Sequence, residues 1–147
     1  IAEYVPLETL LKECDVITLH TNATAENHHL IDAKAIETMK PGAVIINTAR
    51  GKLIDSDALI AGLESGKLGG AALDVLENEN GLYYYNRMGD VIPNPELAAL
   101  RSMPNVILTD HTAFYTEEDV ESMVRGVLES ADAFAKGQPT RHDVTNL

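Results

Sequence analysis

Short runs of apolar, mostly β-branched or small residues alternate with helical patterns, and this alternation constrains the fold more than any other feature. The runs lack the alternation of polar and apolar residues that marks a strand with one face in water. Strands of this kind are typical of a parallel sheet covered by helices on both faces. The predicted strands are residues 15–19, 43–47, 70–75 and 106–109. The sequence therefore predicts an α/β fold, as one part of a doubly wound, Rossmann-like parallel sheet.

Helical periodicity accounts for most of the sequence between these runs. Asp32 is the predicted N-cap of the second helix, and Gly66 is predicted to end the third. The predicted helices are residues 7–13, 32–39, 56–64, 96–101 and 117–136. Residues 76–104 form a long excursion that contains three consecutive tyrosines, and a polar tail begins at residue 138.

Composition and charge exclude several classes of partner. The chain has 147 residues and a net charge of −12, which argues against nucleic acid and against anionic membrane surfaces. No apolar run approaches the roughly 18 residues that a membrane span requires. The single cysteine, Cys14, excludes an internal disulfide and is typical of a reducing compartment, so we expect a cytoplasmic protein.

Polar residues follow directly after each predicted strand. Because ligands of open parallel sheets bind beyond the carboxyl ends of the strands, these positions are the candidates for a site. They are His20-Thr21-Asn22, Thr48-Ala49-Arg50-Gly51, the segment 75–79 with two glutamates, and the segment 111–115 that begins with His111 and ends with Tyr115.

An arginine, a histidine and carboxylates at one edge have a specific chemical use. An arginine can bind a small carboxylate through two hydrogen bonds, and a histidine can exchange a proton with a carbonyl or hydroxyl oxygen near neutral pH. A carboxylate beside the histidine would orient the ring and favour the imidazolium. These groups indicate interconversion of a 2-keto acid and a 2-hydroxy acid with hydride from a cofactor. The alternative is that these polar residues only cap the helices that follow.

Several segments resemble the D-isomer-specific 2-hydroxyacid dehydrogenases. Residues 46–55 (INTARGKLID) resemble that family's N-T-x-R-G-x-x-V/I-D signature, and residues 69–75 (GGAALDV) resemble its G-x-A-x-D-V strand. Residues 104–111 (PNVILTDH) resemble P-N-V-x-x-T-P-H, and the opening residues 10–20 are also similar to the family. The resemblance covers essentially the whole chain in order.

The resemblance implies a role for individual residues. Arg50 would bind the substrate carboxylate, His111 would be the catalytic acid and base, and Glu79 would be its partner, although Glu77 is close in sequence. The cofactor would be NAD. The residues implied to line it are His20, Thr21, Asn22, Asn27, Thr48, Ala49 and Asp74.

Residues 111–116 (HTAFYT) and the tyrosine-rich segment 81–86 resemble the D-lactate dehydrogenase branch, which includes the vancomycin-resistance enzymes. This implies reduction of a small 2-keto acid such as pyruvate to the D-2-hydroxy acid. Tyr115 is a candidate substrate contact. A homodimer is a further expectation from the family. The alternative function is an NAD(H)-sensing binding module, such as a corepressor of the same fold.

The sequence also departs from the family pattern. Asp110 stands where a proline is usual, and it could either stabilise the His111 imidazolium or face solvent. No G-x-G-x-x-G occurs. We therefore expect a C-terminal fragment that binds NAD poorly and is inactive by itself. Residues 1–115 would be the C-terminal part of the NAD-binding domain, and residues 116–147 would be a helix crossing to a substrate domain outside this chain, with a tail.

His28 and His29 raise the possibility of a metal site. Adjacent side chains are expected to point apart, and no third ligand is spaced nearby in the sequence, so we predict no metal.

Overall fold

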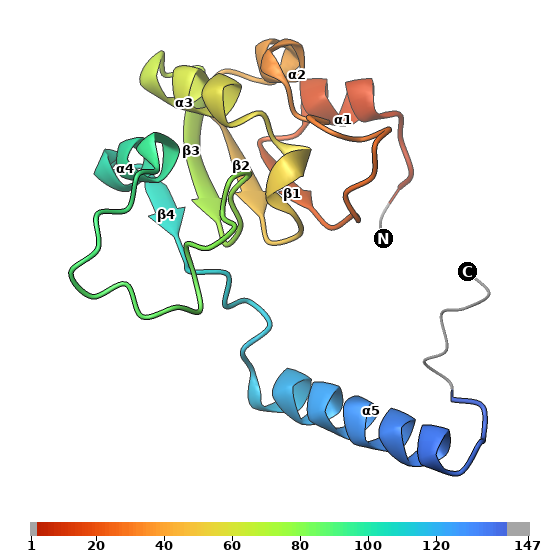
Figure 1. The fold of residues 1–147 in the computed structure, drawn as a ribbon. Coiled ribbons are helices and arrows are strands. Elements are labelled where there is room, and N and C mark those ends of the chain that lie inside the picture. Colours follow the sequence, from red (N-terminus) through yellow and green to blue (C-terminus); the bar gives the residue numbers. More distant parts are fainter. Residues whose placement is uncertain (1–2, 141–147) are drawn as a thin grey trace. The chain divides into compact units, whose positions relative to one another are not determined.

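The structure, a computed structural model, describes residues 3–140 and has the predicted α/β architecture (Figure 1). Part of the predicted polar tail, residues 141–147, lies outside the described residues. The helices are α1 (Leu7–Glu13), α2 (Ala33–Thr38), α3 (Ser56–Glu64), α4 (Pro95–Ser102) and α5 (Glu117–Ala135), with a 3-10 turn η1 (Gly51–Leu53). The strands are β1 (Val16–Leu19), β2 (Ala43–Asn47), β3 (Leu68–Leu73) and β4 (Val106–Leu108).

The four strands form one parallel sheet in the order β1-β2-β3-β4. The pairing register aligns their last residues, because Leu19 pairs with Asn47, Asn47 with Leu73, and Leu73 with Leu108. The strands therefore end at the same edge, to which the arrowheads in Figure 1 all point. The residues that follow each strand are brought to this carboxyl edge.

The hydrophobic core lies between one face of the sheet and the helices. In a parallel sheet whose strands follow the order of the chain, right-handed crossovers place the connecting helices on the same face. Buried side chains of the sheet, such as Ile17 and Ile45, accordingly cluster with Ile36, Leu59 and Leu100 from α2, α3 and α4. The opposite face carries Val16 and Ile107, which are 54% and 68% exposed. Helices were expected to cover both faces of the sheet. Within the described residues they cover one face only.

Side-chain caps explain where several helices begin. The predicted N-cap Asp32 is confirmed, since its carboxylate accepts a hydrogen bond of 2.7 Å from the amide of Ala35. Asp55 and Asn94 cap α3 and α4 in the same way. Gly66, at φ 75°, follows α3 as predicted.

The chain divides into two compact units, residues 1–111 and 112–147. The first contains the sheet and helices α1–α4. In the second, α5 has no buried residue, and Thr116 caps its first turn. The predicted crossing of this helix to another domain stays a prediction. None of the described helices is both long and apolar enough to cross a membrane.

Candidate active site

His111 and Glu79 form a hydrogen-bonded pair near the carboxyl edge of the sheet. The Nδ1 atom of His111 lies 2.8 Å from Oε1 of Glu79, and both side chains are partly buried, at 28% and 19% exposed. The other carboxylate oxygen of Glu79 accepts a 2.9 Å hydrogen bond from the amide of Leu76, which fixes its orientation. Glu79, rather than Glu77, is thus the glutamate that meets the histidine.

The backbone at His111 is unusual and is held by a tyrosine. His111 has φ 53°, a conformation that non-glycine residues seldom adopt. The hydroxyl of Tyr84 donates a 2.5 Å hydrogen bond to the carbonyl oxygen of His111. Burial, followed by the charges of Glu79 and Asp74, raises the pKa of the Tyr84 phenol. Nothing local to the tyrosine run predicts this contact, because Tyr84 and His111 are 27 residues apart.

A buried amide organises the turn that carries Arg50. Asn47, the last residue of β2, is only 1% exposed. Its side chain accepts a hydrogen bond from the amide of Ala49 and donates one to the carbonyl of Arg50, each at 3.0 Å. Arg50 itself is exposed, and its guanidinium donates to the carbonyl of Ala49 at 2.6 Å. The buried side chain of Asn47 therefore holds the turn, while Arg50 remains accessible to solvent. Thr48 is exposed in the same turn.

Asp74 follows β3 and is 4% exposed. The hydroxyl of Thr109 donates a 2.5 Å hydrogen bond to its carboxylate. A buried carboxylate requires such partners. This hydrogen bond also joins the ends of β3 and β4, and Thr109 lies two residues before His111 in the sequence.

Asn27 shapes the turn after β1 that was predicted to line the cofactor. Its side-chain amide donates to the carbonyl of Asn22 and accepts from the amide of Thr24, both at 2.7 Å. His20 is exposed and lies 2.9 Å from the hydroxyl of Thr18 through Nε2, and Thr21 is also exposed. Asn27 is therefore a residue that holds this loop in shape.

The expected geometry of His28 and His29 is wrong. Their rings stack with centroids 3.9 Å apart, because His29 has φ 54°. A third potential ligand, Glu77, is also close: its Oε1 lies 2.6 Å from Nε2 of His29 and 3.7 Å from Nε2 of His28. Sequence spacing could not reveal Glu77, which is 48 residues away from His29. The prediction that no metal binds here stays a prediction.

The remaining candidates lie elsewhere. Asp110 pairs with Arg101 at 3.1 Å and is 61% exposed, so it faces solvent and a cation. Tyr115 belongs to the second unit, in which it is 75% exposed and contacts Phe114. Its role as a substrate contact stays a prediction.

The arrangement can bind an anion and move a proton. The bond from Nδ1 to Glu79 selects the tautomer or charge state with a proton on Nδ1, which leaves Nε2 as the ring atom that exchanges a proton with a ligand. The arginine offers two parallel donors for a carboxylate. A site with these groups can bind a 2-keto or 2-hydroxy acid. It combines an acid–base group and a carboxylate receptor with the edge of a parallel sheet, where a dinucleotide can bind beside the acid.

Comparisons with known proteins agree with this geometry. Residues 1–113 match the family described as D-isomer specific 2-hydroxyacid dehydrogenase, NAD binding domain. An aromatic 2-oxoacid reductase from Clostridium sporogenes is 48% identical over 132 residues, which are 90% of this chain and 40% of that protein. The D-lactate dehydrogenase of Escherichia coli is 43% identical over 92% of this chain and 41% of that protein. A crystal structure of a D-lactate dehydrogenase from Treponema pallidum has a TM-score of 0.93 and 41% identity, over 97% of this chain and 43% of that one.

The fold and the edge of the sheet thus define one part of a Rossmann-like NAD-binding domain. The chain belongs to the D-isomer specific 2-hydroxyacid dehydrogenase family. It spans about 40% of the length of the curated relatives that it matches. The resemblance inferred from the sequence, including the likeness to D-lactate dehydrogenases, is confirmed.

Gly51 packs against the segment that carries Glu79, and we expect Gly51→Ala to destabilise this region. A Cβ atom at Gly51 would lie 2.0 Å from the carbonyl oxygen of Leu76 and 2.5 Å from the amide nitrogen of Glu77. Backbone must move to relieve such overlap, so the free energy of unfolding should fall by about 2–3 kcal/mol. Urea denaturation would measure it. Lys52→Ala, which shortens the exposed neighbouring side chain, is the control and should change stability by less than about 0.5 kcal/mol. An unchanged midpoint for Gly51→Ala would contradict the close approach.

Proposed function

We propose that the protein carrying this chain is an NAD-dependent oxidoreductase that reduces a small 2-keto acid, such as pyruvate, to the D-2-hydroxy acid. The observation that carries the proposal is the 2.8 Å contact between His111 and Glu79 near the edge of the sheet where Arg50 also stands. Family membership supports the same reaction class.

In this proposal each residue acts on a defined atom. Arg50 binds the substrate carboxylate and so orients the neighbouring carbonyl. His111 donates the proton from Nε2 to the carbonyl oxygen as the C–O double bond is reduced. Glu79 stabilises the imidazolium before the transfer. NADH, when bound, supplies the hydride that forms the new C–H bond, so hydride and proton together give the hydroxy acid and NAD⁺.

The loops at the sheet edge fit a dinucleotide in their chemistry. Thr48 offers an exposed hydroxyl, the turn from His20 to Asn27 is polar and internally braced, and Asp74 is a buried carboxylate. In our proposal these residues, with Thr21, Asn22 and Ala49, line the NAD site, and Asp74 lies near the nicotinamide.

The test is NADH oxidation by the full-length protein with pyruvate, 2-ketoisocaproate and phenylpyruvate. The last acid is included because two relatives at 48% identity are named aromatic 2-oxoacid reductases. Preferred turnover of pyruvate would support the lactate assignment, and preference for phenylpyruvate would move the proposal to aromatic acids. NADH binding without oxidation by any of the three acids would refute the proposed reaction and favour an NAD(H)-sensing module.

We further propose that the 147-residue chain alone binds NAD weakly and turns over no substrate, because no G-x-G-x-x-G phosphate-binding turn occurs in it. Calorimetric titration of the isolated chain with NAD should give a dissociation constant above about 1 mM, which corresponds to about −4 kcal/mol. Binding in the micromolar range would contradict this. A homodimer of the full-length protein is part of the proposal, and light scattering would measure it.

A further inference from the structure

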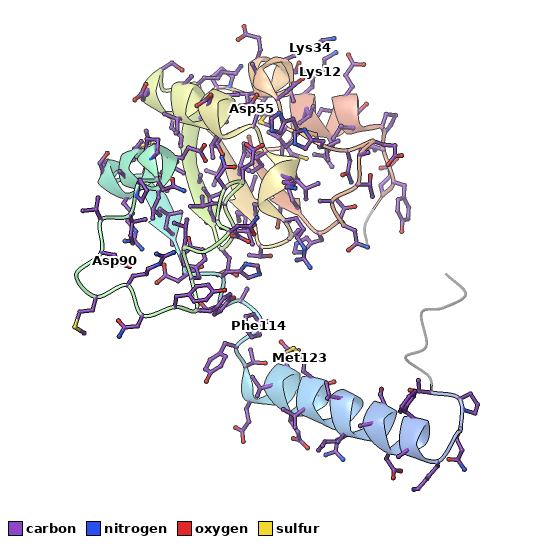
Figure 2. The ribbon with its side chains drawn as sticks, viewed as in Figure 1. Lys12, Lys34, Asp55, Asp90, Phe114 and Met123 are labelled. Atoms are coloured by element: carbon purple, nitrogen blue, oxygen red, sulfur yellow. The ribbon has the colours of Figure 1, made fainter. Side chains whose placement is uncertain are left out.

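His29 and Glu77 form a close hydrogen-bonded pair that has no part in the proposed reaction. Its 2.6 Å contact joins residues 48 positions apart, and the carboxylate of Glu77 is 18% exposed. The other ring nitrogen of His29 lies 3.6 Å from the carboxylate of Asp55, the N-cap of α3 that is labelled in Figure 2. The second oxygen of Glu77 lies 3.5 Å from the amide of Ser56. Glu77 is thus held by two separate segments of the chain.

The direct contact favours a hydrogen-bonded pair over a metal site. Two ligands about 2.0 Å from a tetrahedral zinc ion stand about 3.3 Å apart. His29 and Glu77 are closer than that, at a distance typical of a charge-assisted hydrogen bond.

The backbone around His29 joins the same segments. The amide of His29 donates a 2.9 Å hydrogen bond to the carbonyl of Lys52, and the amide of Ile31 donates to the carbonyl of Leu53 at the same distance. The left-handed conformation of His29, like that of His111, persists where the surrounding structure fixes it. His29 therefore contacts η1, which directly follows Arg50, through its backbone amide, and it contacts Glu77 through its ring.

The Glu77 segment in turn carries Glu79. Residues 75–79 are contacted by Gly51, where no Cβ could fit, and by the ring of His29, which bonds to the carboxylate of Glu77. One carboxylate oxygen of Glu79 accepts a hydrogen bond from the amide of Leu76 in this same segment, and the other bonds to His111. A shift of the segment would therefore move Glu79 relative to the ring that it orients.

We propose that His29 and Glu77 are positioning residues that hold the 75–79 segment so that Glu79 meets Nδ1 of His111. The geometry of the pair does not depend on turnover, but its catalytic consequence rests on the function proposed above. A displacement of about 1 Å at such a point is large enough to impair proton transfer.

The first measurement is made without substrate. In full-length protein labelled with ¹⁵N-histidine, the Nδ1–H proton of His111 that bonds to Glu79 should give a downfield resonance. Glu79→Gln, which removes the acceptor charge, identifies the signal. We expect Glu77→Gln to weaken or broaden this resonance, while Asp15→Asn, which breaks the exposed 2.9 Å pair with Lys40, should leave it unchanged. An unaltered His111 resonance in Glu77→Gln would overturn the proposal.

The second measurement is kinetic and separates positioning from loss of folding. We expect Glu77→Gln and His29→Gln each to lower kcat by about tenfold with KM for NADH within about twofold, and the double variant to fall no further than either single one. Circular dichroism should show that each variant folds. Additive losses, or equal losses in Asp15→Asn, would contradict a shared positioning role. If the parent protein itself oxidises no NADH with any 2-keto acid, the proposed function fails while the resonance of His111 still decides the positioning role.

Discussion

Replacing His111 by asparagine should lower kcat/KM for reduction of a 2-keto acid by about a thousandfold, equivalent to about 4 kcal/mol of transition-state stabilisation. In our proposal Nε2 of His111 delivers the proton to the carbonyl oxygen, and the ring is set for this by its 2.8 Å contact with Glu79. Asparagine has no group that can act as an acid. It is also the replacement best suited to φ 53°, since asparagine tolerates the left-handed region. Steady-state NADH oxidation by the full-length protein measures the effect.

Asp110→Asn is the matched control for this experiment. Asp110 adjoins His111 in sequence, but it is exposed and paired with Arg101. Such surface pairs contribute little, so its removal should change kcat/KM by less than about threefold. If His111→Asn keeps more than about a tenth of the activity while still binding NADH, the proton comes from another group and the assignment fails.

Replacing Arg50 by glutamine should lower kcat/KM for the keto acid by about a hundredfold to a thousandfold, with the larger part in KM. Two charge-assisted hydrogen bonds to a carboxylate contribute about 3–4 kcal/mol together. Arg50 is exposed at the end of a turn braced by Asn47, so the substitution removes the charged guanidinium fork without opening the core. KM for NADH should stay within about twofold.

Two further variants sharpen this test. Arg50→Lys keeps the charge but loses the fork, so its loss should be smaller than that of Arg50→Gln and still clear. Lys52→Gln removes an exposed cation two residues away and should leave KM for the keto acid within about twofold. An equal rise in KM for Lys52→Gln and Arg50→Gln would mean that general attraction of anions, rather than a specific receptor, explains the result.

The secondary structure was largely predictable because its signals are local. The predicted bounds of α1, α3 and β2 agree with the structure, and those of the other elements differ by one or two residues at one or both ends. Asp32 as an N-cap and Gly66 after α3 could be assigned because a cap acts on residues three or four positions away. The main departure is β3, which begins at Leu68 rather than Gly70, because pairing with β2 extends it past the glycines.

The candidate site was predictable in its membership but not in its contacts. The residues after each strand could be assigned to one edge, since all strands of a parallel sheet end there. Whether Glu77 or Glu79 meets His111 was open, because both lie in one loop and differ by two positions. The distances decide it: Glu79 bonds to His111, and Glu77 bonds to His29.

The sequence alone determined the α/β architecture, the family resemblance and the identity of Arg50 and His111 as candidates. These could be predicted because motifs and periodicity depend on residues that are close together in the chain. Tertiary structure decided which groups pair across long separations. The stacking of His28 on His29, the bond from Tyr84 to the backbone of His111, and the close approach of Gly51 to Leu76 all join segments far apart in the chain or depend on a left-handed backbone. Such contacts depend on the summed packing of the whole domain, and no local pattern specifies them.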